Sequence, residues 1–537
     1  MRCSFAVLVK PPLPQTITRN DRPEEYLVSI DRHSSATATV DVQNPATGAV
    51  VGSVPLQTAD AVQAVVRELR SRQPAWEALG SEGRAAWLRK LRNWLLDNES
   101  RLVEELHAET SKPRAEAVLE VMMICDAINY YSDRARKFLA DERPRPHGLL
   151  TVQKKLTQVY RPYPVVGIIS PWNFPLMIPG VDAVPALLAG AAVVIKPSEV
   201  TPMSGLGLAR GWREIGAPPV LACVTGRGET GAAVVDSVDM VQFTGSTRTG
   251  RAIAARAGER LIPCSVELGG KDPAIVLADA DLVRAANGIA WGGLVNSGQA
   301  CISVERVYVE ASVYDRFLEL LAERVSALRQ GLDDGCASAD IGALATVQQA
   351  EIVRGHVDDA LARGAGLLTG SIVRDTGMFV EPTILVDVDH SMACMREETF
   401  GPTIPVMRVA DAEEAIRLAN DCEYGLSATV WTKDRARGEA IARRLEVGSV
   451  NINDAYANLF CFALPQGGWK NSGLGSRLGG AQGVRKYCRR QAITAPRVRP
   501  PKNEVLWYPY SPRRARTVAK MLRLLAARNV RRRLFRG

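Results

Sequence analysis

Hydrophobic and polar positions follow two different periods along the chain. Between residues 56 and 145, apolar residues recur at intervals of three and four positions, as in "SEGRAAWLRKLRNWLLDNESRLVEELHAE". This spacing places apolar side chains on one face of an α-helix. We therefore predict a series of amphipathic helices over residues 56–145.

From Gln158 onward, short β-branched runs alternate with helical stretches. The runs include "PVVGIIS", "AAVVIKP", "MVQFTGS" and "PAIVLA", and residues 301–450 repeat the alternation. Such alternation is typical of parallel α/β sheets. Two other segments, "KKLTQVYRPYP" and "QGVRKYCRRQAITAPR", predict strands that stand apart. The pattern predicts an α/β fold with two main domains, in keeping with 537 residues.

Composition and charge narrow the classes of function. The chain is 46% hydrophobic, and no apolar run approaches the roughly 20 residues that a membrane-spanning helix needs. Ten of the 67 basic residues and none of the 58 acidic ones lie in residues 511–537. The rest of the chain is therefore close to neutral, and we expect no nucleic-acid partner.

Cysteines and histidines are scattered through the sequence. The ten cysteines form no CxxC pair, and the five histidines show no metal-ligand spacing. This pattern favours reduced thiols in a cytoplasm, with neither a disulfide framework nor a metal site. Cys301, in "NSGQACISVER", could be one more buried thiol or a reactive nucleophile. The other motifs of the chain are needed to decide between the two.

Several short motifs occur in a specific order. They are "ISPWNFP" (169–175), "IKPSEVTP" (195–202), "FTGSTRTG" (243–250), "ELGGKDP" (267–273), "SGQACI" (297–302), "EETFGP" (397–402) and "NINDA" (451–455). Together they closely resemble the aldehyde dehydrogenase superfamily over about residues 35–495. The whole chain also resembles actinobacterial proteins labelled succinate-semialdehyde dehydrogenase.

The resemblance implies a Rossmann-type cofactor domain, an α/β catalytic domain and a small β oligomerisation element. It also implies a homodimer or homotetramer. The expected limits are an N-terminal extension at 1–34, a cofactor domain at 35–147 and 164–266, oligomerisation strands at 148–163 and 481–497, a catalytic domain at 267–480 and a basic tail at 498–537.

The resemblance also assigns catalytic roles. Cys301 would attack the aldehyde carbon, because a thiol ester formed there is easily hydrolysed. Asn173 and the Cys301 backbone N–H would hold the oxyanion, and Glu267 would activate water. Without the other motifs, Asn173 could be a turn residue and Glu267 a solvated loop acid.

A second group of residues would hold a nicotinamide cofactor. A Gly-rich turn before a helix offers free N–H groups to a pyrophosphate, and "FTGSTRTG" supplies one. Glu199 falls where the family holds the adenosine ribose, and a carboxylate there favours NAD over NADP. We therefore expect NAD, with NADP as the alternative. The implied cofactor residues are Ile169, Pro171, Trp172, Lys196, Ser198, Glu199, Gly228, Phe243, Gly245, Ser246, Thr249, Leu268, Glu398 and Phe400.

Two departures from the family pattern bear on mechanism and substrate. Ser476 and Arg477 stand where many relatives carry Arg-Glu, so a second general base is missing. Val181 stands eight residues after Asn173, where established semialdehyde enzymes carry a carboxylate-binding arginine. An apolar mouth around Leu176, Met177 and Val181 suits an apolar aliphatic or aromatic aldehyde.

Three alternatives to that substrate assignment are open. One is succinate-semialdehyde oxidation, with another cation such as Arg477 gripping the carboxylate. A second is acyl transfer to coenzyme A, against which Glu267 argues. The third, from another class, is a catalytically silent binding protein on the same fold, since fold does not fix function.

The basic tail carries its own pattern. Val518, Met521, Leu522 and Leu525 follow helical spacing among arginines. A basic amphipathic helix can lie on an anionic membrane surface, such as the inner face of a cell membrane. It could equally pack on a partner subunit or remain a disordered solubilising tail. We expect a cytoplasmic protein with one of these three uses for residues 511–537.

Overall fold

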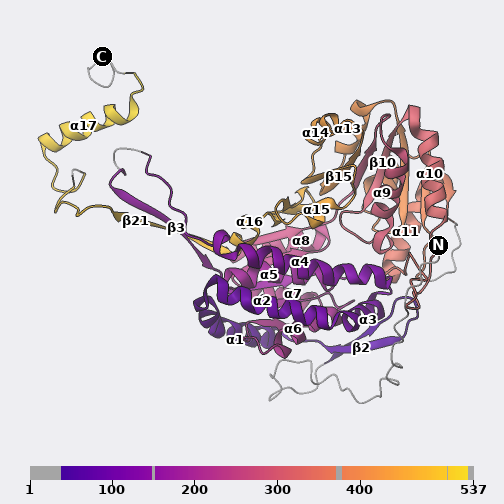
Figure 1. The fold of residues 1–537 in the computed structure, drawn as a ribbon, viewed down its shortest axis with the longest axis horizontal. Coiled ribbons are helices and arrows are strands. Elements are labelled where there is room, and N and C mark those ends of the chain that lie inside the picture. Colours follow the sequence, from indigo (N-terminus) through magenta and orange to yellow (C-terminus); the bar gives the residue numbers. More distant parts are fainter. Residues whose placement is uncertain (1–37, 148–150, 371–377, 505, 530–537) are drawn as a thin grey trace, which may run out of the picture.

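The computed structural model describes residues 38–147, 151–370, 378–504 and 506–529 (Figure 1). The N-terminal extension expected at 1–34 lies outside this part. A β-hairpin opens the described chain, and the helices predicted over residues 56–145 follow it. These elements are β1 (Thr39–Gln43), β2 (Val50–Pro55), α1 (Ala59–Ala78), α2 (Gly80–Asp97), α3 (Glu99–Thr110) and α4 (Arg114–Phe138).

The first large sheet has the order β19-β8-β7-β4-β5-β6, and all its neighbouring strands are parallel except β19. Every residue of β4, β5 and β7 is buried, which explains their continuous apolar runs. The strands are β4 (Val165–Ile169), β5 (Ala192–Lys196), β6 (Leu221–Cys223), β7 (Met240–Thr244), β8 (Cys264–Glu267) and β19 (Gly473–Leu474). The connecting helices are α5 (Met177–Ala189), α6 (Met203–Glu214), α7 (Gly228–Ser237) and α8 (Thr247–Glu259).

The carboxyl ends of these strands gather the predicted site residues at one edge. The last residues of β4, β5, β7 and β8 are Ile169, Lys196, Thr244 and Glu267. Glu267 pairs with Thr244 on one side and with Gly473 on the other. Ligands of open parallel sheets bind outside this edge, so the sheet itself places the site.

The second large sheet has the order β11-β12-β13-β10-β9-β15-β16. Its strands are β9 (Asp272–Val276), β10 (Val304–Glu310), β11 (Gly366–Thr369), β12 (Thr383–Val386), β13 (Thr403–Val409), β15 (Ser427–Trp431) and β16 (Ser449–Ile452). Its helices are α9 (Leu282–Leu294), α10 (Tyr314–Ser326), α11 (Val347–Ala362), α12 (Ala393–Arg396), α13 (Ala412–Asn420), α14 (Arg435–Ala442) and α15 (Ala457–Phe460). The two α/β regions predicted from the sequence are thus both present.

Short elements join the two regions and cross the expected domain limits. β19 comes from the range expected to be catalytic, yet it extends the first sheet. α16 (Ala481–Arg485) lies in a range expected to form oligomerisation strands, yet it is helical and packs against α4 and α5. The remaining short strands are β14 (Tyr424–Gly425), β17 (Pro465–Gln466), β18 (Trp469–Lys470) and β20 (Arg477–Leu478).

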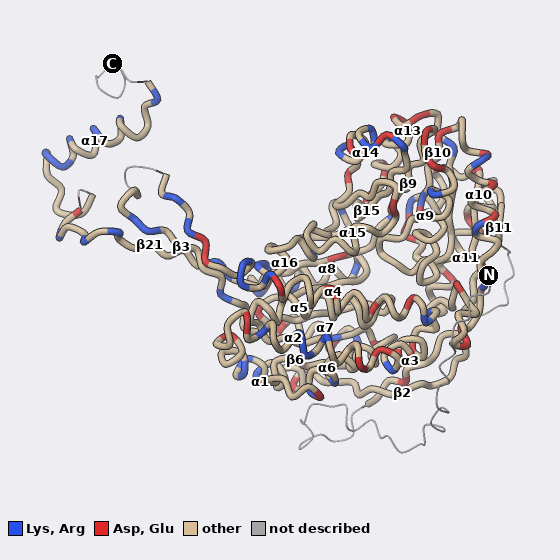
Figure 2. Tube along the Cα trace, in the orientation of Figure 1, with Lys and Arg blue, Asp and Glu red and all other residues tan. Residues whose placement is uncertain are grey.

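A two-stranded ribbon and the tail helix extend away from the main body (Figure 1). The ribbon consists of β3 (Lys154–Pro162) and β21 (Cys488–Pro496), paired antiparallel along their whole length. α17 (Pro512–Ala526) follows it and has no buried residue. Figure 2 shows basic residues along α17 and no acidic ones. Among the described residues, no helix is both long enough and apolar enough to cross a membrane.

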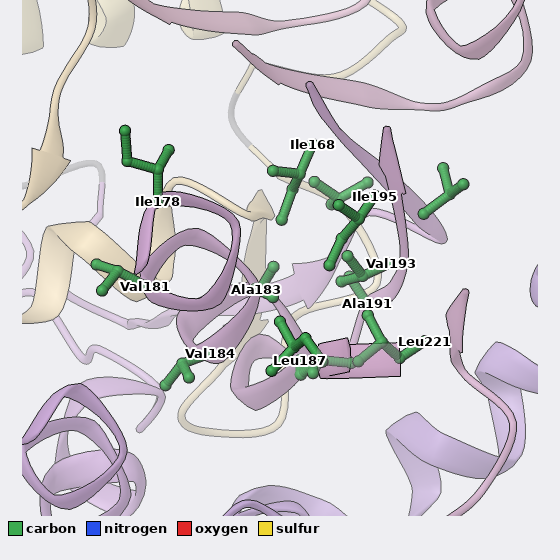
Figure 3. Packing of buried hydrophobic residues seen from close by; sticks show 14 of the residues in the cluster. Ile168, Ile178, Val181, Ala183, Val184, Leu187, Ala191, Val193, Ile195 and Leu221 are labelled. Atoms are coloured by element: carbon green, nitrogen blue, oxygen red, sulfur yellow. The ribbon is translucent and has the colours of Figure 1, made fainter. Parts of the chain in front are cut away.

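α5 is buried at every position and lies at the centre of the largest hydrophobic cluster (Figure 3). Ala183 and Leu187 of this helix lie on the side that faces strand residues such as Ile195, whereas Val181 lies on the opposite side, still within the same buried cluster. The apolar mouth expected around Leu176, Met177 and Val181 is therefore largely core, and Leu176 is fully buried.

Candidate active site

A cavity of about 760 Å³ lies at the carboxyl edge of the first sheet and reaches Cys301. Every predicted site residue except Glu267 lines it, including Asn173, Glu199 and Glu398. Residues far apart in sequence therefore meet around one hollow, which is the usual form of a cofactor and substrate site.

A strained turn carries Cys301. Asn296 and Ser297 adopt left-handed backbone conformations, with φ of 56° and 58°. Both carboxylate oxygens of Glu116 accept a hydrogen bond from the Asn296 N–H at 3.1 Å. A Cβ on Gly298, whose φ is +73°, would lie 2.0 Å from the Gly401 carbonyl oxygen. Only glycine fits there, so "NSGQAC" is a packed loop that fixes the thiol.

The Asn173 side chain is tied to this loop. Its Nδ2 donates to the Gln299 carbonyl oxygen at 2.9 Å. Its backbone oxygen accepts from Lys112 Nζ at 2.8 Å and from Asn296 Nδ2 at 3.0 Å. An amide group carries two N–H donors, so Asn173 keeps one for a ligand in the cavity.

A buried ion pair supports Asn173 from behind. Lys112 Nζ lies 2.5 Å from Glu120 Oε1, and both side chains are almost wholly buried. Glu120 Oε2 also accepts from the N–H groups of Leu176 and Met177, at 3.0 and 2.9 Å, where α5 begins. No motif pointed to this pair, because both residues lie in the helical region that precedes the motifs.

Glu267 lies behind the cavity wall and is 3% exposed. Burial raises the pKa of its carboxyl to about 7, although Arg477 and Lys486 act in the opposite direction. The Arg477 backbone N–H donates to this carboxylate, while Oε1 has no hydrogen-bond partner. An unpaired oxygen and a pKa near neutrality suit a general base.

Cys301 lines the cavity with a partly exposed side chain. Burial raises the pKa of the Cys301 thiol to about 12, and the positive charge of Arg477 acts in the opposite direction. Apolar residues surround it: Val295, Ala300, Ile302, Leu426, Ala455 and Tyr456, with Phe174 and Leu459 packed against them. The thiol therefore needs local positive charge to ionise.

Arg477 is anchored within the protein through two of its three guanidinium nitrogens. Its Nε and Nη2 donate to the two carboxylate oxygens of Asp182 at 2.8 and 2.9 Å, and Nη2 also donates to Thr244 Oγ1. The side chain is 8% exposed. Arg477 is thus not free to grip a substrate carboxylate, contrary to the use considered for it above.

The other half of the cavity suits a dinucleotide. Ser246 caps α8 by accepting the Thr249 N–H at 3.3 Å, so the first N–H groups of α8 open toward the cavity. A Cβ on Gly245 would lie 2.6 Å from the Phe243 ring, so glycine is needed for the backbone to lie this close to the ring. Lys196 Nζ lies 3.3 Å from Glu199 Oε2, and the Glu199 side chain stays 40% exposed at the expected ribose position.

Glu398 and Phe400 are held at the junction of the two halves. Glu398 Oε1 accepts the Gly270 N–H at 3.0 Å, and burial raises its pKa to about 8. Phe400 has a left-handed φ of 53° and meets Trp172 edge to face, with ring centroids 5.4 Å apart. Buried Glu305 accepts the Phe400 N–H at 2.8 Å. The arrangement fits the ring and ribose that the resemblance assigns to these residues.

Sequence reasoning missed part of the cavity wall. Small and apolar residues of α7 and α8 form one side, and α11 contributes another. These residues are Gly231, Ala232, Val235, Ala252, Ala255, Gln349 and Ile352. The small residues facing one another in "GETGAAVVDS" and "TRTGRAIAARAGE" were a usable signal for a flat slot between two helices.

Comparison with known proteins bears directly on this geometry. A family model described as "Aldehyde dehydrogenase family" matches residues 32–493. The chain belongs to the aldehyde dehydrogenase family. This aldehyde dehydrogenase is an oxidoreductase that uses NAD or NADP, as the sequence motifs predicted.

Relatives of this aldehyde dehydrogenase have diverse names. It is 42% identical over 457 residues to a Mycolicibacterium smegmatis protein provisionally named succinate-semialdehyde dehydrogenase (NADP(+)), covering 84% of this chain and 88% of that one. It is 39% identical over 478 residues to 4,4'-diapolycopene aldehyde oxidase of Methylomonas sp, covering 88% of each. A Mycobacterium tuberculosis aldehyde dehydrogenase solved with NAD+ superposes with a TM-score of 0.81 at 34% identity, covering 86% of this chain and 95% of that one.

Proposed function

We propose that this enzyme oxidises apolar aliphatic or aromatic aldehydes to carboxylic acids through a covalent intermediate on Cys301. The thiolate forms a C–S bond to the carbonyl carbon, giving a thiohemiacetal. Loss of hydride from that carbon leaves a thioester. The position of Cys301, at the junction of the dinucleotide half and the apolar cluster, supports this role.

Asn173 stabilises the tetrahedral oxygen. Its second amide N–H and the Cys301 backbone N–H are the donors. Because Gln299, Lys112 and Asn296 fix the asparagine before substrate arrives, little reorganisation is needed.

Glu267 completes the cycle by deprotonating the water that attacks the thioester. The C–S bond then breaks, and the thiol is released with the acid. Oε1 has no hydrogen-bond partner and is therefore the atom available for that proton. Glu267 lies outside the cavity lining, so a water between it and the thioester is the acting nucleophile.

Lys196, Glu199, Ser246 and Phe400 would hold the cofactor along the cavity. When bound, the nicotinamide supplies the oxidant that accepts the hydride. Glu199 supports NAD as the preferred form, because a half-exposed carboxylate at the ribose end accepts from a 2′-hydroxyl and repels a 2′-phosphate.

The apolar surroundings of Cys301 carry the substrate assignment. Phe174 and Leu459 pack beside the thiol, and two buried cations nearby are already paired, Lys112 with Glu120 and Arg477 with Asp182. A substrate carboxylate would lose its hydration there without gaining a partner. The names of several relatives favour succinate semialdehyde as the second candidate.

Substrate profiling tests the assignment. Reduced-cofactor formation should give a higher kcat/KM for hexanal, decanal and benzaldehyde than for succinic semialdehyde, with Cys301→Ala inactive on all. Phe174→Ala should raise KM for the apolar aldehydes. Preference for succinic semialdehyde would reject the apolar assignment and favour the second candidate.

The ribbon supports assembly into a homodimer or homotetramer. β3 and β21 pair only with each other among the described strands, and apart from a single bridge between Glu142 and Gln158 of β3, their outer edges keep backbone groups without strand partners. Ile493 on β21 is 44% exposed. Light scattering should give a dimer or tetramer, and Ile493→Asp should shift the population toward monomer.

The tail helix supports contact with an anionic membrane surface. On α17, Val518, Leu522 and Leu525 are exposed on one side, and basic residues cover the other. Trp507 and Tyr508 are exposed just before it. Removal of residues 511–537 should abolish sedimentation with phosphatidylglycerol vesicles and leave the weak response to phosphatidylcholine unchanged. Unaltered sedimentation would eliminate the membrane role.

A further inference from the structure

Four charged side chains gather around Glu267; three of them are buried, and the fourth, Lys486, is partly buried. They are Glu267 itself, Arg477, Asp182 and Lys486, contributed by β8, β20, α5 and the segment after α16. Their charges balance when all are ionised. Uncompensated charges in such a place would be costly, so each cation has a specific task.

The anchoring of Arg477 fixes where its charge lies. Asp182 receives two of its N–H groups, and Thr244 receives a third contact. Thr244 is the register neighbour of Glu267 in the sheet, and the Arg477 backbone N–H donates to the Glu267 carboxylate. The guanidinium is therefore held next to the base by two side chains and its own backbone.

We propose that Arg477 is a positioning residue that supplies the fixed positive charge facing both Glu267 and Cys301, in place of the glutamate that many relatives carry. This inference rests on the proposed function. A guanidinium cannot accept a proton, so Arg477 does not act as a second base. It acts through its field, which favours the carboxylate of Glu267 and the thiolate of Cys301.

The surrounding charges single out Arg477 for this task. Thr244, which accepts a hydrogen bond from Arg477, lines the same cavity as Cys301. At Cys301 the Arg477 charge opposes Asp272, Glu398 and Glu267, which all disfavour the thiolate. At Glu267 it acts together with Lys486 against Asp182.

Lys486 is the weaker partner. Its Nζ donates to Gln242 Oε1 at 2.7 Å and to the Ser476 carbonyl oxygen at 2.9 Å, and burial lowers its pKa to about 8. Lys486 thus loses charge in the working pH range, whereas Asp182 keeps the pKa of Arg477 raised. Arginine is the residue that stays charged when buried.

Two reactions of the free enzyme test the proposal without knowledge of the physiological aldehyde. Alkylation by iodoacetamide reports the Cys301 thiolate, and hydrolysis of 4-nitrophenyl acetate reports acylation and Glu267-assisted deacylation. In Arg477→Gln, both pH profiles should move to higher pH by about one unit, the effect of removing a nearby opposite charge. At pH 7 this is about a tenfold loss of the alkylation rate and about a fivefold loss of the Glu267-assisted rate, because Glu267 titrates near pH 7. Arg477→Lys should recover part of the shift below pH 8.

Control variants separate charge from folding. The double variant Arg477→Gln, Asp182→Asn leaves no unpaired aspartate and should keep a smaller upward shift. Arg210→Gln removes another arginine with two hydrogen bonds to a carboxylate, that of Glu105, at similar burial. It should lower the melting temperature comparably and leave both profiles in place.

Two different outcomes would overturn the role of Arg477 and the proposed function. Unmoved profiles in a folded Arg477→Gln protein would overturn the role of Arg477 alone. Ester hydrolysis that survives in Cys301→Ala would contradict the proposed function, and this inference with it.

Discussion

The side-chain amide of Asn173 donates a hydrogen bond to the carbonyl oxygen of Gln299, 2.9 Å away and two residues before Cys301. This contact joins the segment after β4 to the turn that carries the thiol. This hydrogen bond therefore fixes Asn173 relative to Cys301, the two residues that would act on the same substrate carbonyl. The oxyanion donor is in place before any substrate binds.

Replacement of Asn173 should slow chemistry without disturbing the thiol. We expect Asn173→Ala to lower kcat by about 10²–10³-fold, the usual cost of one oxyanion donor. Alkylation of Cys301 by iodoacetamide should stay within about twofold, because Asn173 acts on the bound aldehyde. Asn44→Ala, which removes a buried asparagine bonded to Ala108, is the matched control and should keep full kcat. An equal loss in both variants would point to folding.

The Lys112–Glu120 pair should matter for stability and for alignment. Lys112→Met leaves the buried Glu120 without its cation, a loss that typically costs about 3–5 kcal/mol. The urea midpoint of unfolding should fall clearly, and Lys112→Met with Glu120→Gln should recover part of it. Arg316→Ala breaks an exposed pair with Glu319 and should change stability by about 1 kcal/mol or less. Equal effects at both sites would show that burial of the first pair is unimportant.

Glu199 should decide between the two cofactors. Glu199→Gln removes a negative charge from the ribose end of the cavity. The ratio of kcat/KM for NADP to that for NAD should rise about tenfold or more. Glu229→Gln, on an exposed acid of the first turn of α7, should leave the ratio unchanged. A wild-type enzyme that already prefers NADP would contradict the assignment.

The pH dependence of deacylation should report Glu267. Its pKa is raised to about 7 by burial, and the carboxylate is the active form. Below pH 7 the protonated form accumulates, so the rate should fall toward tenfold per pH unit; above pH 7 it should level off. Single-turnover hydrolysis of a preformed acyl-enzyme measures this directly, and a flat profile from pH 5.5 to 7 would remove Glu267 from the role.

Sequence patterns predicted the helices of residues 56–145 and both α/β regions, because each depends on local periodicity; for the tail they left a helix and a disordered segment as alternatives. Ordered motifs likewise placed Asn173 and Cys301 at one cavity. The supporting contacts could not be predicted in this way. Lys112 is 61 positions from Asn173, and Arg477 is 295 positions from Asp182, so no periodicity connects them. The sequence prediction put the apolar entrance of the substrate site at Val181. In sequence, an apolar stretch of a fully buried helix cannot be told from one that lines an open site.

The division of labour between Cys301 and Glu267 is the central claim, and trapping the acyl-enzyme tests it most directly. Glu267→Gln would be mixed with excess NAD and hexanal, and reduced cofactor and intact protein mass would be followed together. We predict one rapid turnover per active site, then near arrest, with a hexanoyl adduct located on Cys301 by peptide mapping. Sustained turnover without an adduct, or an adduct on another residue, would contradict the account.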